Sequence, residues 1–69
     1  MFHYQINIYW SEEDQAYLAE VPELPGCMAD GQSYQLALDN VQVIMQEWIE
    51  TALHLGREIP VPHPRLSAA

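Results

Sequence analysis

The sequence predicts an α+β domain in which a three-stranded antiparallel sheet packs on one long helix, with a possible short fourth strand after the helix. Apolar and polar residues alternate over residues 2–10, which is typical of a half-buried strand. Between residues 37 and 55, apolar residues recur every three or four positions, which indicates one buried helical face. Because the chain has 69 residues, a single domain is expected.

Two strands are expected to form an antiparallel hairpin. The residues predicted on the buried face of the first strand are Phe2, Tyr4, Ile6, Ile8 and Trp10. The polar segment 11–15 then reverses the chain into a second strand over 16–21. Pro22 and Pro25 lack backbone N–H donors and end that strand, so a short third strand is expected over 27–29.

A helix is predicted from Tyr34 to Leu55, with Ser33 as its N-cap and Gly56 closing its C-terminus. The row expected to face the sheet consists of Ala37, Val41, Ile44, Trp48, Ala52 and Leu55. A second apolar row consists of Leu38, Met45, Ile49 and Leu53. The two rows together are wider than one small sheet requires, so the second row is predicted to be the oligomer face of a homodimer or homotetramer.

The segment after the helix is expected to be a short edge strand or an extended arm. Residues 59–62 read Ile-Pro-Val-Pro, and alternate prolines cannot donate to a ladder of strand hydrogen bonds. The domain is therefore placed at residues 1–62, followed by a flexible C-terminal tail at residues 63–69.

The charge of the chain favours a basic protein as its partner. Ten acidic residues against two arginines give a formal net charge of −8, which repels phosphate backbones and anionic lipids. Acidic patches instead steer basic proteins into encounter, although the acidity could also serve solubility alone. The residues assigned to partner binding are Tyr9, Glu12, Glu13, Asp14, Glu20 and Glu23.

No pattern of catalytic or metal-binding residues is found in the sequence. The three histidines are far apart, and Cys27 has no partner for an internal disulfide and no motif of an activated nucleophile around it. The carboxylates do not cluster at the spacing of a metal site. The chain is therefore expected to be a non-enzymatic protein without a cofactor or metal. The absence of a signal peptide pattern and of a long apolar run predicts a cytoplasmic location.

Several motifs resemble those of the HicB antitoxins. They are the run Tyr-Leu-Ala-Glu-Val-Pro-Glu-Leu-Pro-Gly-Cys over residues 17–27, the pair Asp30-Gly31, Ser33 before Ala37-Leu38, and Gly56 followed by Ile59, Pro60 and Pro62. The resemblance spans residues 4–62. The motif residues assigned a structural role are Pro22, Leu24, Pro25, Gly26, Cys27 and Gly31.

The resemblance implies a βββαβ domain similar to a partly degraded ribonuclease H fold without a working catalytic centre. It also implies that the chain binds and blocks a HicA-like toxin, a small basic protein that cleaves messenger RNA. Where the family often carries paired glutamates after Ser33, this chain has Gln35-Leu36, so the usual capping box is missing.

Two alternatives to a toxin-binding role remain open at the level of the sequence. One is a stand-alone HicB-like oligomer with a ligand-sensing or scaffolding role and no toxin. The other is a residual ribonuclease H-like nuclease, which predicts binding of divalent metal ions. Direct DNA binding is not expected, because no appended DNA-binding domain follows the helix.

Overall fold

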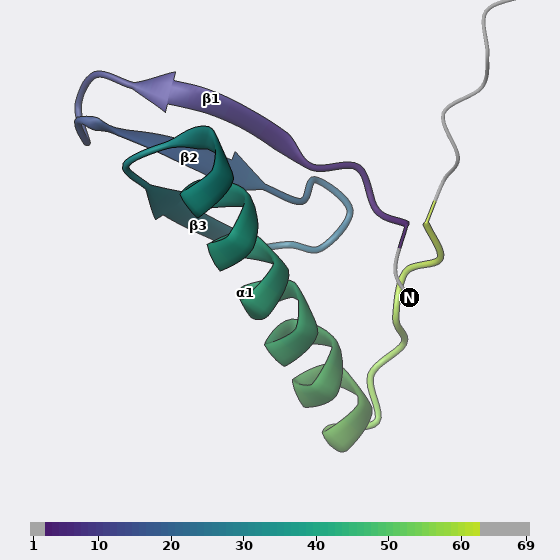
Figure 1. The fold of residues 1–69 in the computed structure, drawn as a ribbon. Coiled ribbons are helices and arrows are strands. Elements are labelled where there is room, and N and C mark those ends of the chain that lie inside the picture. The colour runs from purple at the N-terminus through teal and green to yellow at the C-terminus, as the bar shows by residue number, and fades with distance from the viewer. Residues whose placement is uncertain (1–2, 63–69) are drawn as a thin grey trace, which may run out of the picture.

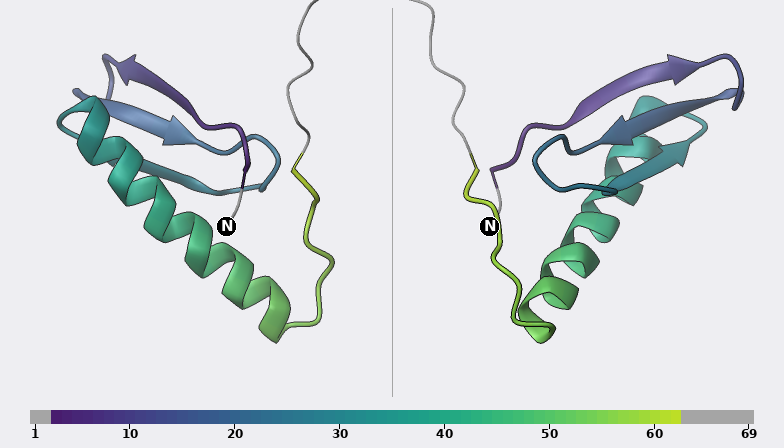
Figure 2. Two further views of the ribbon diagram at one scale, coloured as in Figure 1. Left: turned by 45° about the vertical axis from the view of Figure 1, so that its right-hand side comes forward. Right: turned by 180° about the vertical axis from the view of Figure 1, so that it is seen from behind.

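The computed structural model describes residues 3–62, which form three strands and one helix (Figure 1). The strands β1 (Asn7–Ser11), β2 (Ala16–Glu20) and β3 (Met28–Gly31) make one antiparallel sheet in the order β1-β2-β3. The helix α1 (Tyr34–His54) crosses one face of this sheet, and Figure 2 shows that no described element covers the other face. The predicted α+β class is confirmed.

The strand register determines which side chains face the helix. Residues directly opposite each other on neighbouring strands point to the same face of a sheet. Two rows face α1. One row consists of Ile8, Ala19 and Ala29, and the other consists of Trp10, Tyr17 and Gly31. Two further rows lie on the opposite face. One consists of Asn7, Glu20 and Met28, and the other consists of Tyr9, Leu18 and Asp30. Ala19 is fully buried, while Ile8 and Ala29 pack on the core from β1 and β3.

The first strand is shorter than the sequence predicts. It begins at Asn7, which is paired with Glu20, the last residue of β2. The chain leaves the sheet at Val21 and Pro22, so the residues before Asn7 have no strand to pair with. Tyr4 is nevertheless buried in the core, as the alternation indicates, whereas Phe2 lies outside the described residues.

The proline-bracketed motif forms a compact loop between β2 and β3. Three backbone hydrogen bonds close it: Val21 N–H to the Cys27 carbonyl at 3.0 Å, Leu24 N–H to Val21 at 3.1 Å and Cys27 N–H to Leu24 at 3.0 Å. Leu24 and Cys27 are buried inside, and Gly26 adopts a positive φ of 79°. The loop therefore fills one end of the core, and it delays the start of β3 until Met28.

The ends of α1 agree with the predicted caps. The Ser33 hydroxyl accepts a hydrogen bond from the Leu36 N–H at 3.1 Å. At the other end, Gly56 (φ 71°) donates to the Leu53 carbonyl at 3.1 Å and Arg57 donates to the Ala52 carbonyl at 2.8 Å. These two bonds make a Schellman motif, which satisfies the last carbonyls of the helix. Along residues 3–62, no helix is long and apolar enough to cross a membrane.

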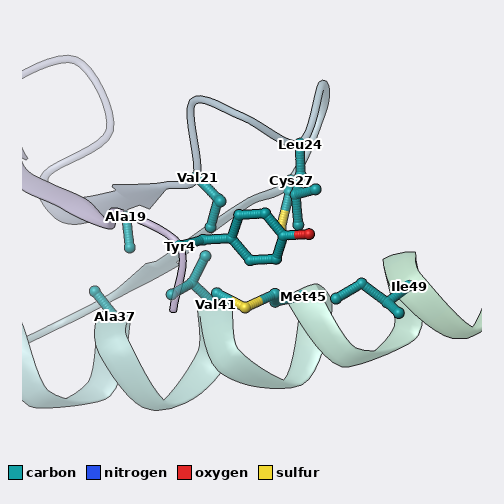
Figure 3. Close-up of a cluster of buried hydrophobic side chains, with 9 residues drawn as sticks. All are labelled: Tyr4, Ala19, Val21, Leu24, Cys27, Ala37, Val41, Met45 and Ile49. Atoms are coloured by element: carbon teal, nitrogen blue, oxygen red, sulfur yellow. The ribbon is translucent and has the colours of Figure 1, made fainter. Parts of the chain in front are cut away.

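The core lies between α1, the sheet and the loop, as Figure 3 shows. The helix residues buried in it are Ala37, Val41, Met45, Ile49 and Ala52. Met45 and Ile49 are 5% and 3% exposed, so their assignment to an oligomer face is wrong, whereas Leu53 is 66% exposed. Leu55, expected in the core, is 59% exposed because it is the C-cap residue.

The chain after Gly56 forms an extended arm without strand pairing over residues 57–62, so no fourth strand is present in the described part of the chain. Ile59 packs against the core, and the hydroxyl of Tyr4 donates to the carbonyl of Pro60. The arm thus lies beside the N-terminal segment (Figure 2). The tail predicted at residues 63–69 lies outside the described residues.

Candidate protein-binding surface

The face of the sheet opposite the helix carries apolar side chains between carboxylates. We call it the open sheet face, and its residues are Asn7, Tyr9, Leu18, Glu20, Met28 and Asp30. Tyr9 and Met28 are 42% and 46% exposed, and Leu18 lies half-buried between β1 and β3. Exposed aromatic and apolar side chains among polar residues are common in protein interfaces.

A second acidic group lies at the hairpin tip, next to the open sheet face. This acidic turn consists of Glu12, Glu13 and Asp14, all exposed, and it joins β1 to β2. The Ser11 hydroxyl donates to Asp14 Oδ2 at 2.8 Å and the Trp10 indole N–H donates to Glu12 Oε2 at 2.5 Å. Gln15 adopts a positive φ of 50°, which completes the reversal. The turn therefore presents three carboxylates in a locally bonded loop.

The structure brings together most of the residues predicted to bind a partner. Tyr9 and Glu20 lie on the open sheet face, and Glu12, Glu13 and Asp14 extend from its turn end. Glu23 lies in the β2–β3 loop, outside the strand rows. Burial, and secondly the negative charge of Glu23, raise the pKa of the Tyr4 hydroxyl, so that this group stays protonated and donates to the arm.

Four residues of the open sheet face were not among those assigned to partner binding from the sequence: Asn7, Leu18, Met28 and Asp30. The alternation along β2 could have found Leu18, which lies between Tyr17 and Ala19 of the opposite face. Met28 and Asp30 lie on β3, and their face depends on the register with which β3 pairs with β2.

Trp10, predicted in the core, is instead 44% exposed. Its row does face α1, but the helix packs mainly on β3 and β2 and leaves the tip of β1 uncovered. Its ring meets Tyr17 edge to face, with 5.1 Å between centroids, and Tyr17 stacks on Tyr34 of α1 at 4.3 Å. An aromatic cluster therefore borders the turn end of the sheet on the helix side.

The described residues offer little for catalysis. Cys27 is 1% exposed, and burial raises the pKa of its thiol, which keeps it protonated and unreactive at neutral pH. Within residues 3–62, no group of three or more histidine, cysteine or acidic side chains is arranged to hold a metal ion.

The fold and the open sheet face define a small α+β domain, a helix on one side of a sheet whose other side is exposed. The chain belongs to the UPF0150-like family, whose model matches residues 4–60. It is 33% identical over 58 residues to the UPF0150 protein ssl0259 of Synechocystis sp., covering 84% of this chain and 78% of that protein. It is 34% identical over 53 residues to the UPF0150 protein Ta0767 of Thermoplasma acidophilum, covering 77% of each.

The fold is shared with a solved structure. The crystal structure of TTHA0281 from Thermus thermophilus superposes with a TM-score of 0.70 at 24% identity, over 87% of this chain and 82% of that one. At this level of identity the likeness establishes the common fold, and it places the three strands and the helix of this chain in a known arrangement.

Proposed function

We propose that this chain is an antitoxin-type protein that binds a small basic toxin of the HicA kind and neutralises it by covering the surface with which the toxin cleaves messenger RNA. The observation that carries the proposal is the open sheet face, where the apolar side chains of Tyr9, Leu18 and Met28 lie among the carboxylates of Glu20 and Asp30, with the acidic turn beside it. The resemblance of the loop and cap motifs to HicB antitoxins supports the same partner.

The two parts of this surface have different tasks in binding. The acidic turn and the net charge of −8 attract a basic protein and increase the rate of association. Tyr9 and Met28 exclude water from the contact and slow dissociation, because buried aromatic and apolar side chains supply most of the binding free energy of an interface. The surface blocks the toxin by contact alone and needs no reactive group.

The test uses the product of the gene adjoining this one, expressed alone and with this chain. We expect the adjoining basic protein to arrest growth, and co-expression of this chain to restore it. Met28→Asp should weaken the complex by about 10- to 100-fold, because it replaces an exposed apolar contact of the open sheet face by a charge. The matched control is Val43→Asp, which changes an exposed apolar residue of α1 that is not on the sheet.

The binding of each variant is measured by isothermal titration calorimetry after circular dichroism has shown that both are folded. If the wild-type chain does not bind or rescue, the proposed function is wrong. If it binds and Met28→Asp binds equally well, a different surface contacts the toxin.

A further inference from the structure

The aromatic cluster on the helix side of the sheet leaves much of its ring surface exposed. It consists of Trp10 of β1, Tyr17 of β2 and Tyr34 of α1, so it joins three elements at the turn end of the domain. Tyr17 is half-buried and contacts both other rings, whereas Trp10 is 44% exposed and Tyr34 is 59% exposed. Exposed aromatic rings that lie together on a surface are typical of sites that bind another molecule.

The rings of the cluster are held in place before anything binds. Trp10 meets Tyr17 edge to face with 5.1 Å between centroids, and Tyr17 lies 4.3 Å from Tyr34. The indole N–H of Trp10 also donates to the carboxylate of Glu12, which fixes the orientation of the indole ring. Side chains whose orientation is set beforehand lose little conformational entropy when a partner packs on them.

The electrostatic surroundings of the cluster favour a cation. The faces of aromatic rings carry partial negative charge, and tryptophan attracts cations most strongly. Glu12 is bonded to the indole, and Glu13 and Asp14 follow it in the acidic turn. The helix α1 begins at the same end of the molecule (Figure 1), and a helix N-terminus carries roughly half a positive charge. The three carboxylates exceed this opposing charge.

The described part of the chain does not supply a cation to the cluster. Arg57 is the one Lys or Arg side chain among residues 3–62, and it follows the C-terminal end of α1. The helix has 21 residues, and at about 1.5 Å per residue it is roughly 30 Å long. Arg57 therefore lies far from Tyr34, and a cation at the cluster has to come from another molecule.

An arginine side chain fits these rings better than a lysine does. The guanidinium group is planar, so it can stack flat on an aromatic ring while its N–H donors stay free for carboxylates nearby. The ammonium group of lysine is compact and more strongly hydrated, so it loses more on stacking. From the exposed rings, their fixed orientation and the carboxylates beside them, we infer that the aromatic cluster binds an arginine side chain presented by a basic protein.

The inference rests on the proposed function for the identity of that protein, which is the basic partner of the open sheet face. The strand β1 lies at the edge of the sheet, and its neighbours Tyr9 and Trp10 point to opposite faces. A partner that covers the open sheet face and reaches around the edge of β1 brings an arginine to the cluster. The hairpin would then be held from both faces of the sheet.

The site is tested first with short peptides and the full chain. Tetra-arginine is titrated at low salt into protein labelled with nitrogen-15, and the indole N–H signals are followed by nuclear magnetic resonance. The Trp10 signal should shift, whereas the signal of Trp48, in the C-terminal half of α1, should not. Tetra-lysine carries the same charge but stacks poorly, so it should bind at least about three-fold more weakly.

Substitutions show whether the rings themselves hold the peptide. Trp10→Leu and Tyr34→Leu should each weaken the binding of tetra-arginine at least about three-fold, followed through the backbone amides of the acidic turn. The matched control is Tyr9→Leu, which removes an exposed ring from the same strand on the opposite face and should leave the affinity unchanged. Circular dichroism verifies that each variant is folded.

Equal affinity of the wild type for the two peptides would overturn the inference, because net charge alone would then explain the binding. A Trp10→Leu variant with full affinity for tetra-arginine, or a Tyr9→Leu variant that loses as much as Trp10→Leu, would overturn it as well.

The adjoining basic protein separates this inference from the proposed function. If the wild type binds tetra-arginine through Trp10 but does not bind that protein, the proposed function is wrong and the arginine site stands. If the wild type binds that protein and Trp10→Leu binds it equally well, the proposed function stands and the inference is wrong. A loss of affinity of about ten-fold in Trp10→Leu would support both.

Discussion

Gly31 lies where β3 passes close to the first turn of α1. A Cβ placed on it would come within 2.4 Å of the Ala37 backbone nitrogen, so any side chain forces the strand and the helix apart. Its φ is not in the left-handed region, and its role is therefore steric. Gly26 and Gly56 are different, because both have positive φ and a Cβ on either would meet open space. The motif glycines thus serve two separate physical needs.

This difference leads to a prediction about two alanine variants. Gly31→Ala should lower the free energy of unfolding by about 3 kcal/mol, because backbone atoms must move to admit the methyl group. Gly56→Ala should cost about 1 kcal/mol, the strain of an L-residue at positive φ. Urea unfolding followed by tryptophan fluorescence measures both. Equal losses would show that close approach is not what requires glycine at position 31.

Cys27 gives a second prediction, for the dependence of stability on pH. Burial raises the pKa of its thiol above the ordinary 9.0, so the folded chain holds this proton more tightly than the unfolded chain. The stability that this tightly held proton contributes is fully present below the pKa of the unfolded thiol. It is lost as the pH rises through the pKa of the folded thiol. The urea midpoint should therefore fall above about pH 9, and it should fall less in Cys27→Ala.

At the scale of the elements, the sequence predicts features that depend on local interactions. The helix begins and ends almost where Ser33 and Gly56 place it, because caps act within a few residues of the chain. The start of β1 could not be found in this way. It depends on where β2 ends, which is decided by the loop that follows Glu20.

The face of the helix was only partly predictable for a similar reason. A wide apolar stripe contains more than one row with three- and four-residue spacing, and the sheet buries the row that includes Met45 and Ile49. Ile44 and Trp48 remain half-buried on its flank. Which row is buried depends on how α1 crosses the sheet, and this is a property of the packed domain.

The cap of α1 can be tested by itself. Ser33→Ala should lower the free energy of unfolding by about 1 kcal/mol, because the Leu36 N–H loses its acceptor. Ser33→Asp should retain stability, since a carboxylate also accepts this bond and interacts well with the positive end of the helix. Chemical unfolding monitored by circular dichroism in the far ultraviolet measures the change. Loss of stability in both variants to the same extent would contradict the capping role.

At the scale of the whole molecule, the charges and the apolar surfaces are distributed over different ends. The acidic turn lies at the β1–β2 end of the sheet (Figure 1). A groove lined by apolar residues such as Trp48 and Leu55 lies at the C-terminal half of α1. The acidic turn lies beside the open sheet face, so a basic partner would meet both together.

The distribution of charge predicts how binding to the proposed basic partner depends on salt. Replacing Glu12, Glu13 and Asp14 by their amides reduces the formal charge from −8 to −5 without removing an apolar contact. Salt at about 0.15 M screens the attraction between exposed charges beyond about 8 Å. The amide substitutions should therefore have their largest effect at low salt. The association rate should fall about ten-fold at low salt, whereas the dissociation rate should change little.

Stopped-flow measurements of the two rates at several salt concentrations test this expectation, with Gln46→Ala and Glu50→Gln on α1 as a control far from the hairpin. The difference between the amide variant and the wild type should shrink as salt is added, because exposed charges are screened. Met28→Asp should behave in the opposite way, with a faster dissociation rate at every salt concentration. An amide variant that associates as fast as the wild type at low salt would mean that the acidic turn does not guide the partner, and the open sheet face would remain as the recognition element.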